Sequence, residues 1–184
     1  MKEQWNDNYC TWGRMMVQED ARVCADRVTV DVIDEIVPLV HIGRVPVHSL
    51  DMDYLKGRGF GAILDLCLDS PLEGDMAKGR GISYHGEYVV DGTSPTEAQF
   101  VRVTEWMKEQ ALKKKKIYVH CHAGLGRAPT VVIAYLILAG LPLFTAVGLV
   151  RKNRKSRQLE ISMHQVDGIT EFAQHVARSR ERVA

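Results

Sequence analysis

Residues 117–130 read Ile-Tyr-Val-His-Cys-His-Ala-Gly-Leu-Gly-Arg-Ala-Pro-Thr, and an apolar run continues to residue 139. Residues 117–120 have the β-branched and aromatic composition of a short buried strand. Residues 121–126 contain two glycines and predict a tight loop. From Arg127 onward the apolar residues predict a buried helix. The stretch therefore predicts a strand, a loop and a helix in direct succession.

The loop has the chemistry of a phosphate site. A loop at a helix N-terminus points successive backbone N–H groups inward, and these donors and the helix dipole favour a bound dianion. Gly124 and Gly126 permit the backbone angles and the close approach that this needs. Arg127 can hold two phosphate oxygens at once, and the positive field favours the nucleophilic thiolate of Cys121. The predicted phosphate-binding residues are His122, Ala123, Gly124, Leu125, Gly126 and Arg127.

The pattern of His120, Cys121, five residues and Arg127 resembles the signature of the cysteine-dependent protein tyrosine phosphatase superfamily. The chain length and the late position of the cysteine are similar to the compact dual-specificity group. The resemblance implies an α/β fold and hydrolysis of phosphomonoesters through a phosphocysteine at Cys121, with Arg127 as a catalytic residue. Two alternatives remain open, namely a buried structural cysteine and a rhodanese-like sulfur-transfer loop, which needs no upstream acid.

Asp91 is the candidate for that upstream acid. Thiolate attack on phosphorus expels an alkoxide or phenoxide, which needs a proton as it leaves. Asp91 follows a predicted strand and lies thirty residues before Cys121. Dual-specificity phosphatases resemble this arrangement, which implies that Asp91 is the general acid. The weaker candidates are Asp65, Asp69 and Asp75.

Three further positions follow from the resemblance. Ala128 stands where most of the family has Ser or Thr, whose hydroxyl would hydrogen-bond the departing thiolate, so a phosphate-binding module with little turnover is a second interpretation. Gln165 lies where some relatives place a water-orienting Gln, although a single amide at a helix start is more often a surface or capping residue. Cys67 is a candidate redox partner of Cys121, with a small buried hydrophobe as the alternative.

The rest of the chain predicts a central, mostly parallel sheet flanked by helices. Ser94-Pro-Thr-Glu97 matches a capping box with Pro95 in the first helical position. Residues 1–27 are expected to cap a single phosphatase catalytic domain of residues 28–184. The predicted strands span residues 28–33, 36–42, 61–67 and 82–90. Besides the helix that Ser94 starts, the predicted helices span residues 49–57, 143–153 and 164–178. Residues 69–81 are expected to be loop.

Composition limits the partners. The 184 residues carry a net charge of +1, which indicates no nucleic-acid partner. The four cysteines lack metal-ligand spacing and indicate a reducing compartment, with the cytoplasm expected and an organelle left open. No signal peptide or membrane span is expected, and the oligomeric state stays open. Because Arg127 and the loop amides would neutralise the phosphoryl oxygens, no metal and no other cofactor are expected.

The substrate class is less constrained. Phosphotyrosine, phosphoserine and phosphothreonine proteins are the first expectation. The loop, including Ala128-Pro129, is also similar to that of plant-type glucan phosphatases. Residues 90–96 and the C-terminal helices are similar to mitochondrial-type phosphatidylglycerophosphate phosphatases, and phosphoinositides rank lower because residues 122–126 include no Lys or Arg. Five basic residues within 151–157 either attract an acidic substrate or membrane surface, or form a solvated helix end.

Overall fold

The structure, a computed structural model, describes residues 28–70, 72–156 and 158–182. Within these residues a five-stranded sheet has the order β1-β2-β5-β3-β4. Strands β2, β5, β3 and β4 are parallel, and β1 pairs with β2 in the antiparallel direction, so the predicted mostly parallel sheet is confirmed. The strands are β1 (Asp34–Val37), β2 (Val40–Gly43), β3 (Phe60–Asp65), β4 (Ser83–Gly86) and β5 (Lys116–His120).

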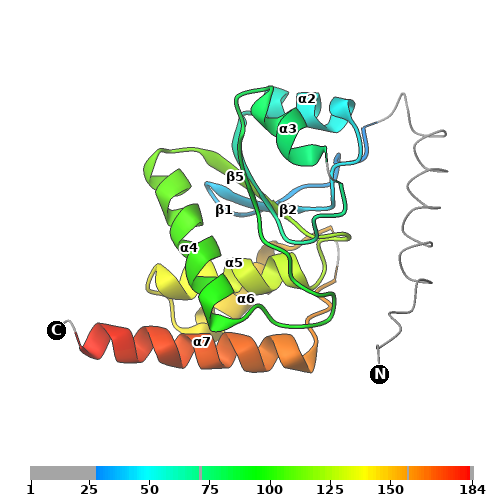
Figure 1. The fold of residues 1–184 in the computed structure, drawn as a ribbon. Coiled ribbons are helices and arrows are strands. Elements are labelled where there is room, and N and C mark those ends of the chain that lie inside the picture. The colour runs from blue at the N-terminus through cyan, green and yellow to red at the C-terminus, as the bar shows by residue number, and fades with distance from the viewer. Residues whose placement is uncertain (1–27, 71, 157, 183–184) are drawn as a thin grey trace, which may run out of the picture.

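Helices cover both faces of the sheet (Figure 1). The first face carries α2 (Ser49–Gly57) and α3 (Glu73–Lys78), and the second carries α4 (Glu97–Leu112), α5 (Arg127–Leu138), α6 (Leu143–Asn153) and α7 (Met163–Glu181). Helix α5 is apolar around nearly its whole circumference because it packs against α4, α6, α7 and the sheet at once. In the described part of the chain, no helix is both long and apolar enough to span a membrane.

Four predicted segments were wrong. Residues 28–33 are not a strand, because the N–H and hydroxyl of Thr29 donate to the Asp51 carboxylate and tie this segment to α2. Residues 36–42 form the β1–β2 hairpin, with a turn at Pro38, which has no N–H to donate. Residues 69–81 contain α3. The strand predicted over 82–90 ends at Gly86, because its neighbour β3 ends at Asp65.

The predicted capping box was displaced by two residues. Thr96, not Ser94, is the N-cap of α4: its hydroxyl accepts from the N–H of Gln99, whose side chain accepts from the N–H of Thr96. Ser94 instead donates its hydroxyl to the Pro95 carbonyl and packs against Gly168 of α7. The N-terminal cap expected over residues 1–27 lies outside the described residues.

Two glycines allow β2 to lie against the loop that follows β5. A Cβ on Gly43 would lie 2.1 Å from the hydroxyl oxygen of Tyr118. Gly124 has a φ of +74°, and a Cβ there would lie 2.3 Å from the Gly43 carbonyl oxygen. The Tyr118 hydroxyl donates to the Arg44 carbonyl at 2.6 Å, which closes this contact. The approach of β2 to the loop therefore depends on the absence of side chains at both positions.

We expect Gly43→Ala to destabilise the protein by about 2 kcal/mol, because the methyl group overlaps a ring that has no exposed side on which to move. Urea unfolding measures this change. Gly57→Ala is the matched control, since a Cβ at Gly57 meets nothing within 4 Å. Equal unfolding midpoints for the two variants would contradict the packing described above.

Candidate active site

The loop between β5 and α5 is held by bonds to its carbonyl groups. The carbonyl of His122 accepts from Val45 N–H, and that of Leu125 accepts from Glu160 N–H, both at 3.0 Å. The Gly126 carbonyl accepts from the N–H and the hydroxyl of Thr130. By contrast, none of the N–H groups of residues 122–126 donates to another described residue. Backbone donors that stay available in this way are what an anion site requires.

Cys121 and Arg127 stand at the two ends of this loop. Cys121 directly follows β5, and its side chain is buried with 3% exposure. Arg127 is the first residue of α5 and is also buried. Its guanidinium donates to the Val89 carbonyl at 3.0 Å, which draws the side chain toward the segment that contains Asp91.

The structure brings Asp91 to this arginine. Asp91 Oδ1 lies 3.1 Å from Arg127 Nε, and the aspartate side chain is 86% exposed. A carboxyl group that is open to solvent and next to the arginine can meet the leaving oxygen of a bound ester. The loop that carries Asp91 is tied to α7, because Gly92 O accepts from the Ser162 hydroxyl at 2.7 Å.

A buried pair of side chains lies next to Cys121. His120 Nε2 is 2.7 Å from Glu73 Oε1, and both residues are fully buried. Burial alone would lower the pKa of His120, but the charge of Glu73 and its hydrogen bond outweigh burial and raise that pKa to about 9. Burial also raises the pKa of Glu73, so the pair holds its proton up to alkaline pH. Glu73 was not among the predicted site residues, because it lies in a segment predicted to be loop.

An ion pair and an arginine add charge at the loop. His122 Nδ1 lies 2.8 Å from Asp69 Oδ2, and this hydrogen bond raises the pKa of His122 and lowers that of Asp69. Arg44 follows β2, and its charge opposes the rise at His122. No described residue forms an ion pair with Arg44. Arg44 was not among the predicted site residues, although Gly43-Arg44 at the end of a predicted strand was the available signal.

Cys67 and Gln165 are both buried. The Cys67 thiol donates to Asp65 Oδ1 at 3.3 Å, and burial together with the charges of Asp65 and Asp69 raises its pKa well above the usual range. A thiol held protonated in this way is a weak nucleophile toward an oxidised Cys121. The amide of Gln165 donates to the Thr93 carbonyl and accepts from the N–H of Ser162.

Asp65, Cys67 and His120 offer one potential metal-ligand atom each, within 4.8 Å of one another. These atoms already bond one another or their neighbours, because Asp65 also accepts from the Tyr84 hydroxyl and His120 pairs with Glu73. A metal ion would have to replace these bonds.

Comparison with known proteins places this geometry in a family. Residues 40–175 match the family model of the dual specificity phosphatase catalytic domain. Over 122 residues the chain is 30% identical to the protein tyrosine phosphatase PRL-1 of Leishmania major, covering 60% of this chain and 67% of that protein. Over 109 residues it is 32% identical to the phosphatidylglycerophosphate phosphatase PTPMT2 of Arabidopsis thaliana, covering 56% of this chain and 46% of that protein. The chain spans between about a third and two thirds of such curated relatives.

Solved structures agree in fold. The active form of Tk-PTP superposes with a TM-score of 0.71 at 28% identity, covering 78% of this chain and 97% of that one. PTPMT1 superposes with a TM-score of 0.72 at 22% identity, covering 82% and 99%, and supports the fold alone. The unpaired loop amides and the Cys121–Arg127 spacing agree with the family match over residues 40–175. Because this match covers more than half of its residues, the chain belongs to the dual-specificity phosphatase family.

Proposed function

We propose that this protein hydrolyses phosphomonoesters through a phosphocysteine intermediate. The observation that carries the proposal is the row of unpaired N–H groups at residues 122–126, closed by the buried guanidinium of Arg127. Together they neutralise three phosphoryl oxygens directly above Cys121. The thiolate attacks phosphorus, an S–P bond forms, and the P–O bond to the leaving group breaks.

Asp91 supplies the proton for this step. The leaving oxygen takes a proton from the Asp91 carboxyl, which becomes a carboxylate beside Arg127. In the second step the same carboxylate accepts a proton from water as the water oxygen attacks phosphorus. The S–P bond then breaks, and inorganic phosphate and the Cys121 thiolate are regenerated.

Phosphotyrosine, phosphoserine and phosphothreonine proteins are the substrates that we propose first. Relatives named as protein tyrosine phosphatases and as dual specificity protein phosphatase 2 of Mus musculus support this class. A phospholipid such as phosphatidylglycerophosphate is the second candidate, favoured by Arg44, which supplies a cation at the loop mouth for a second anionic group. A panel of phosphopeptides, phosphatidylglycerophosphate, phosphoinositides and phosphorylated glucan, compared by kcat/KM, distinguishes these classes. A reducing compartment is the proposed location.

We expect Cys121→Ser to abolish turnover of an aryl phosphate while the variant still binds inorganic phosphate, because the hydroxyl is a far weaker nucleophile but leaves the amide cradle intact. Steady-state assay and calorimetric titration measure the two properties. Substantial activity in this variant would exclude the phosphocysteine. No turnover in the wild-type protein, with phosphate binding retained, would instead favour the low-turnover phosphate-binding module that Ala128 suggests.

Asp91→Asn is expected to lower kcat for phenyl phosphate by about a hundredfold, because the poor leaving group departs without its proton. The loss should be much smaller for difluoromethylumbelliferyl phosphate, whose leaving group needs little protonation. The alkaline limb of the pH–rate profile should flatten as well. If the two substrates lose activity equally, another carboxyl group is the acid, and Asp69 at the loop mouth is the first to test.

The Glu73–His120 pair makes the stability of the folded protein depend on pH. The folded-state pKa of His120, about 9, lies above its ordinary value of 6.5. The stabilisation from the pair is therefore fully present below pH 6.5 and is lost as pH rises through 9. A shift of this size corresponds to about 3 kcal/mol as an upper value.

We expect the free energy of unfolding of the wild-type protein to fall between pH 6.5 and pH 9, and that of Glu73→Gln to change much less, because Gln cannot stabilise the imidazolium by charge. Urea unfolding across this range measures both slopes. Glu105→Gln is the matched control, since Glu105 is exposed and, among the described residues, pairs with Lys108 alone. A Glu73→Gln slope as steep as the wild-type slope would remove the pair as its cause.

A further inference from the structure

The segment that carries Asp91 contacts α7 at three successive residues. The Gly92 carbonyl accepts from the Ser162 hydroxyl at 2.7 Å, and the Thr93 carbonyl accepts from the Gln165 side chain at 3.2 Å. Ser94 packs against Gly168 so closely that a Cβ on that glycine would lie 1.8 Å from the serine hydroxyl oxygen. The first two turns of α7 therefore hold the backbone that directly follows Asp91.

Gln165 is the centre of this arrangement. Its side chain is buried with the residue 1% exposed, and its Oε1 accepts from Ser162 N–H at 3.0 Å while its Nε2 donates to Thr93. A Cβ on Gly126 would lie 3.2 Å from Gln165 Oε1, so the amide also touches the end of the phosphate loop. One side chain thus contacts both the phosphate loop and the Asp91 segment, and both ends of its amide are occupied by backbone groups.

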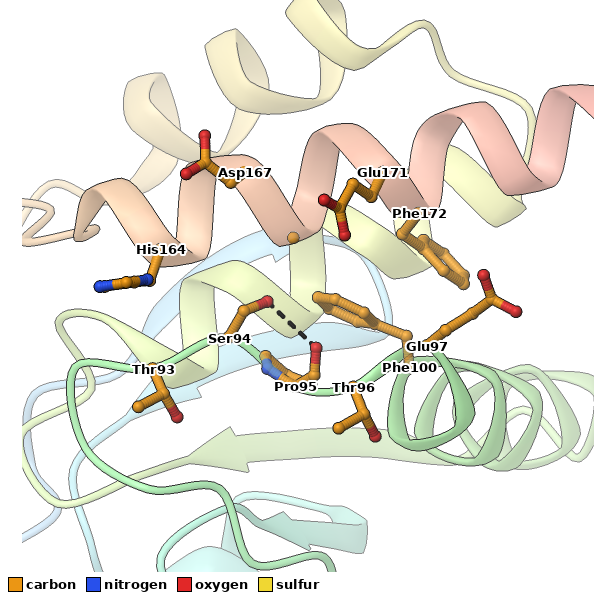
Figure 2. Close-up of a pocket in the computed structure, with 11 residues that line it drawn as sticks. Thr93, Ser94, Pro95, Thr96, Glu97, Phe100, His164, Asp167, Glu171 and Phe172 are labelled. Carbon is orange, nitrogen blue, oxygen red and sulfur yellow. Dashed lines mark hydrogen bonds between the residues drawn. The ribbon is translucent and has the colours of Figure 1, made fainter.

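Beyond these contacts the segment and α7 do not pack closely. A cavity of about 450 Å³ separates residues 93–96 from α7 beyond these contacts. Figure 2 shows His164, Asp167 and Glu171 along α7, with Ser94 and Pro95 on the segment that runs beside the helix. If the bond from Gln165 to Thr93 is removed, the segment can move into this space. The contacts with α7 therefore contribute to the position of Asp91, together with the bond from Arg127 to the Val89 carbonyl.

We propose that Gln165 and Ser162 are positioning residues that hold Asp91 at Arg127, and that Gln165 acts on catalysis through the acid segment and not by orienting water. This inference rests on the proposed function. The amide that would orient water is engaged with Ser162 and Thr93, and the carbonyl that it holds is two residues from Asp91. A shift of about 1 Å in a catalytic group is enough to cost one to two orders of magnitude in rate.

The test is a double-mutant cycle between Gln165→Ala and Asp91→Asn, assayed with phenyl phosphate and difluoromethylumbelliferyl phosphate. We expect Gln165→Ala to lower kcat for phenyl phosphate by about tenfold. The loss should be small for the ester with the better leaving group. In the Asp91→Asn background the same substitution should cost less than about twofold, because its effect passes through a group that is already absent.

Two more variants separate this role from a general loss of structure. Ser162→Ala removes the bond to Gly92 and also the N-cap bond that the Ser162 hydroxyl accepts from Gln165 N–H, at a residue that is only half-buried. It should reproduce the leaving-group pattern of Gln165→Ala even if that variant folds poorly. Gln174→Ala, at an exposed position on the same helix, should match the wild-type protein. Equal losses on both esters, additive losses in the cycle, or a burst of leaving group in Gln165→Ala would each overturn the proposal. The burst would return Gln165 to the water-orienting role. Loss of the Asp91→Asn effect itself would count against the proposed function.

Discussion

The site depends on where the carbonyl groups of one loop are bonded. The carbonyls of three loop residues accept N–H groups from different parts of the fold: His122 from Val45 after β2, Leu125 from Glu160 before α7, and Gly126 from Thr130 within α5. With these oxygens turned outward, the loop N–H groups stay available for a ligand. The cradle is therefore a property of the whole α/β fold, because no single neighbour would orient every peptide group.

Two buried cationic side chains lie near Cys121, and they differ in how completely their charges are paired. His120 has its charge matched by Glu73 at 2.7 Å. Arg127 bonds the Val89 carbonyl and approaches an exposed aspartate, while its buried Nε makes no hydrogen bond. An incompletely paired buried guanidinium lowers stability but is ready for phosphoryl oxygens. The histidine pair is structural support, whereas the arginine retains donors for the substrate.

The local structure around the loop could be predicted from the sequence, because its strand and helix are contiguous with it. Cys121 and Arg127 lie in one contiguous stretch whose strand and helix were confirmed, and α6 and α7 were expected within a few residues of their ends. What escaped prediction depends on contacts distant in sequence. Glu73 meets His120 across 47 positions, and Arg44 reaches the loop only through the parallel register of β2 and β5.

The errors at 28–33 and at Ser94 have a related origin. Thr29 has a β-branched side chain in a favourable pattern, yet the Asp51 carboxylate captures its N–H and its hydroxyl. Ser94 has the right spacing for a cap, yet its place is against Gly168 of a helix that begins some seventy residues later. In both cases a tertiary partner outweighed a valid local preference.

Because residue 128 is an alanine, the buried Glu73–His120 pair becomes relevant to the second step of the proposed mechanism. In the proposed second step the departing thiolate gains charge as the phosphocysteine breaks down, and the hydroxyl that most of the family has at position 128 is missing here. Thr130 cannot replace it, because its own hydroxyl donates to the Gly126 carbonyl at 2.9 Å. The remaining support is the loop amides and the His120 imidazolium, whose charge interacts with Cys121. Glu73 keeps His120 protonated and so maintains a positive charge near the thiolate. This charge compensates in part for the hydrogen bond that a hydroxyl at position 128 would donate.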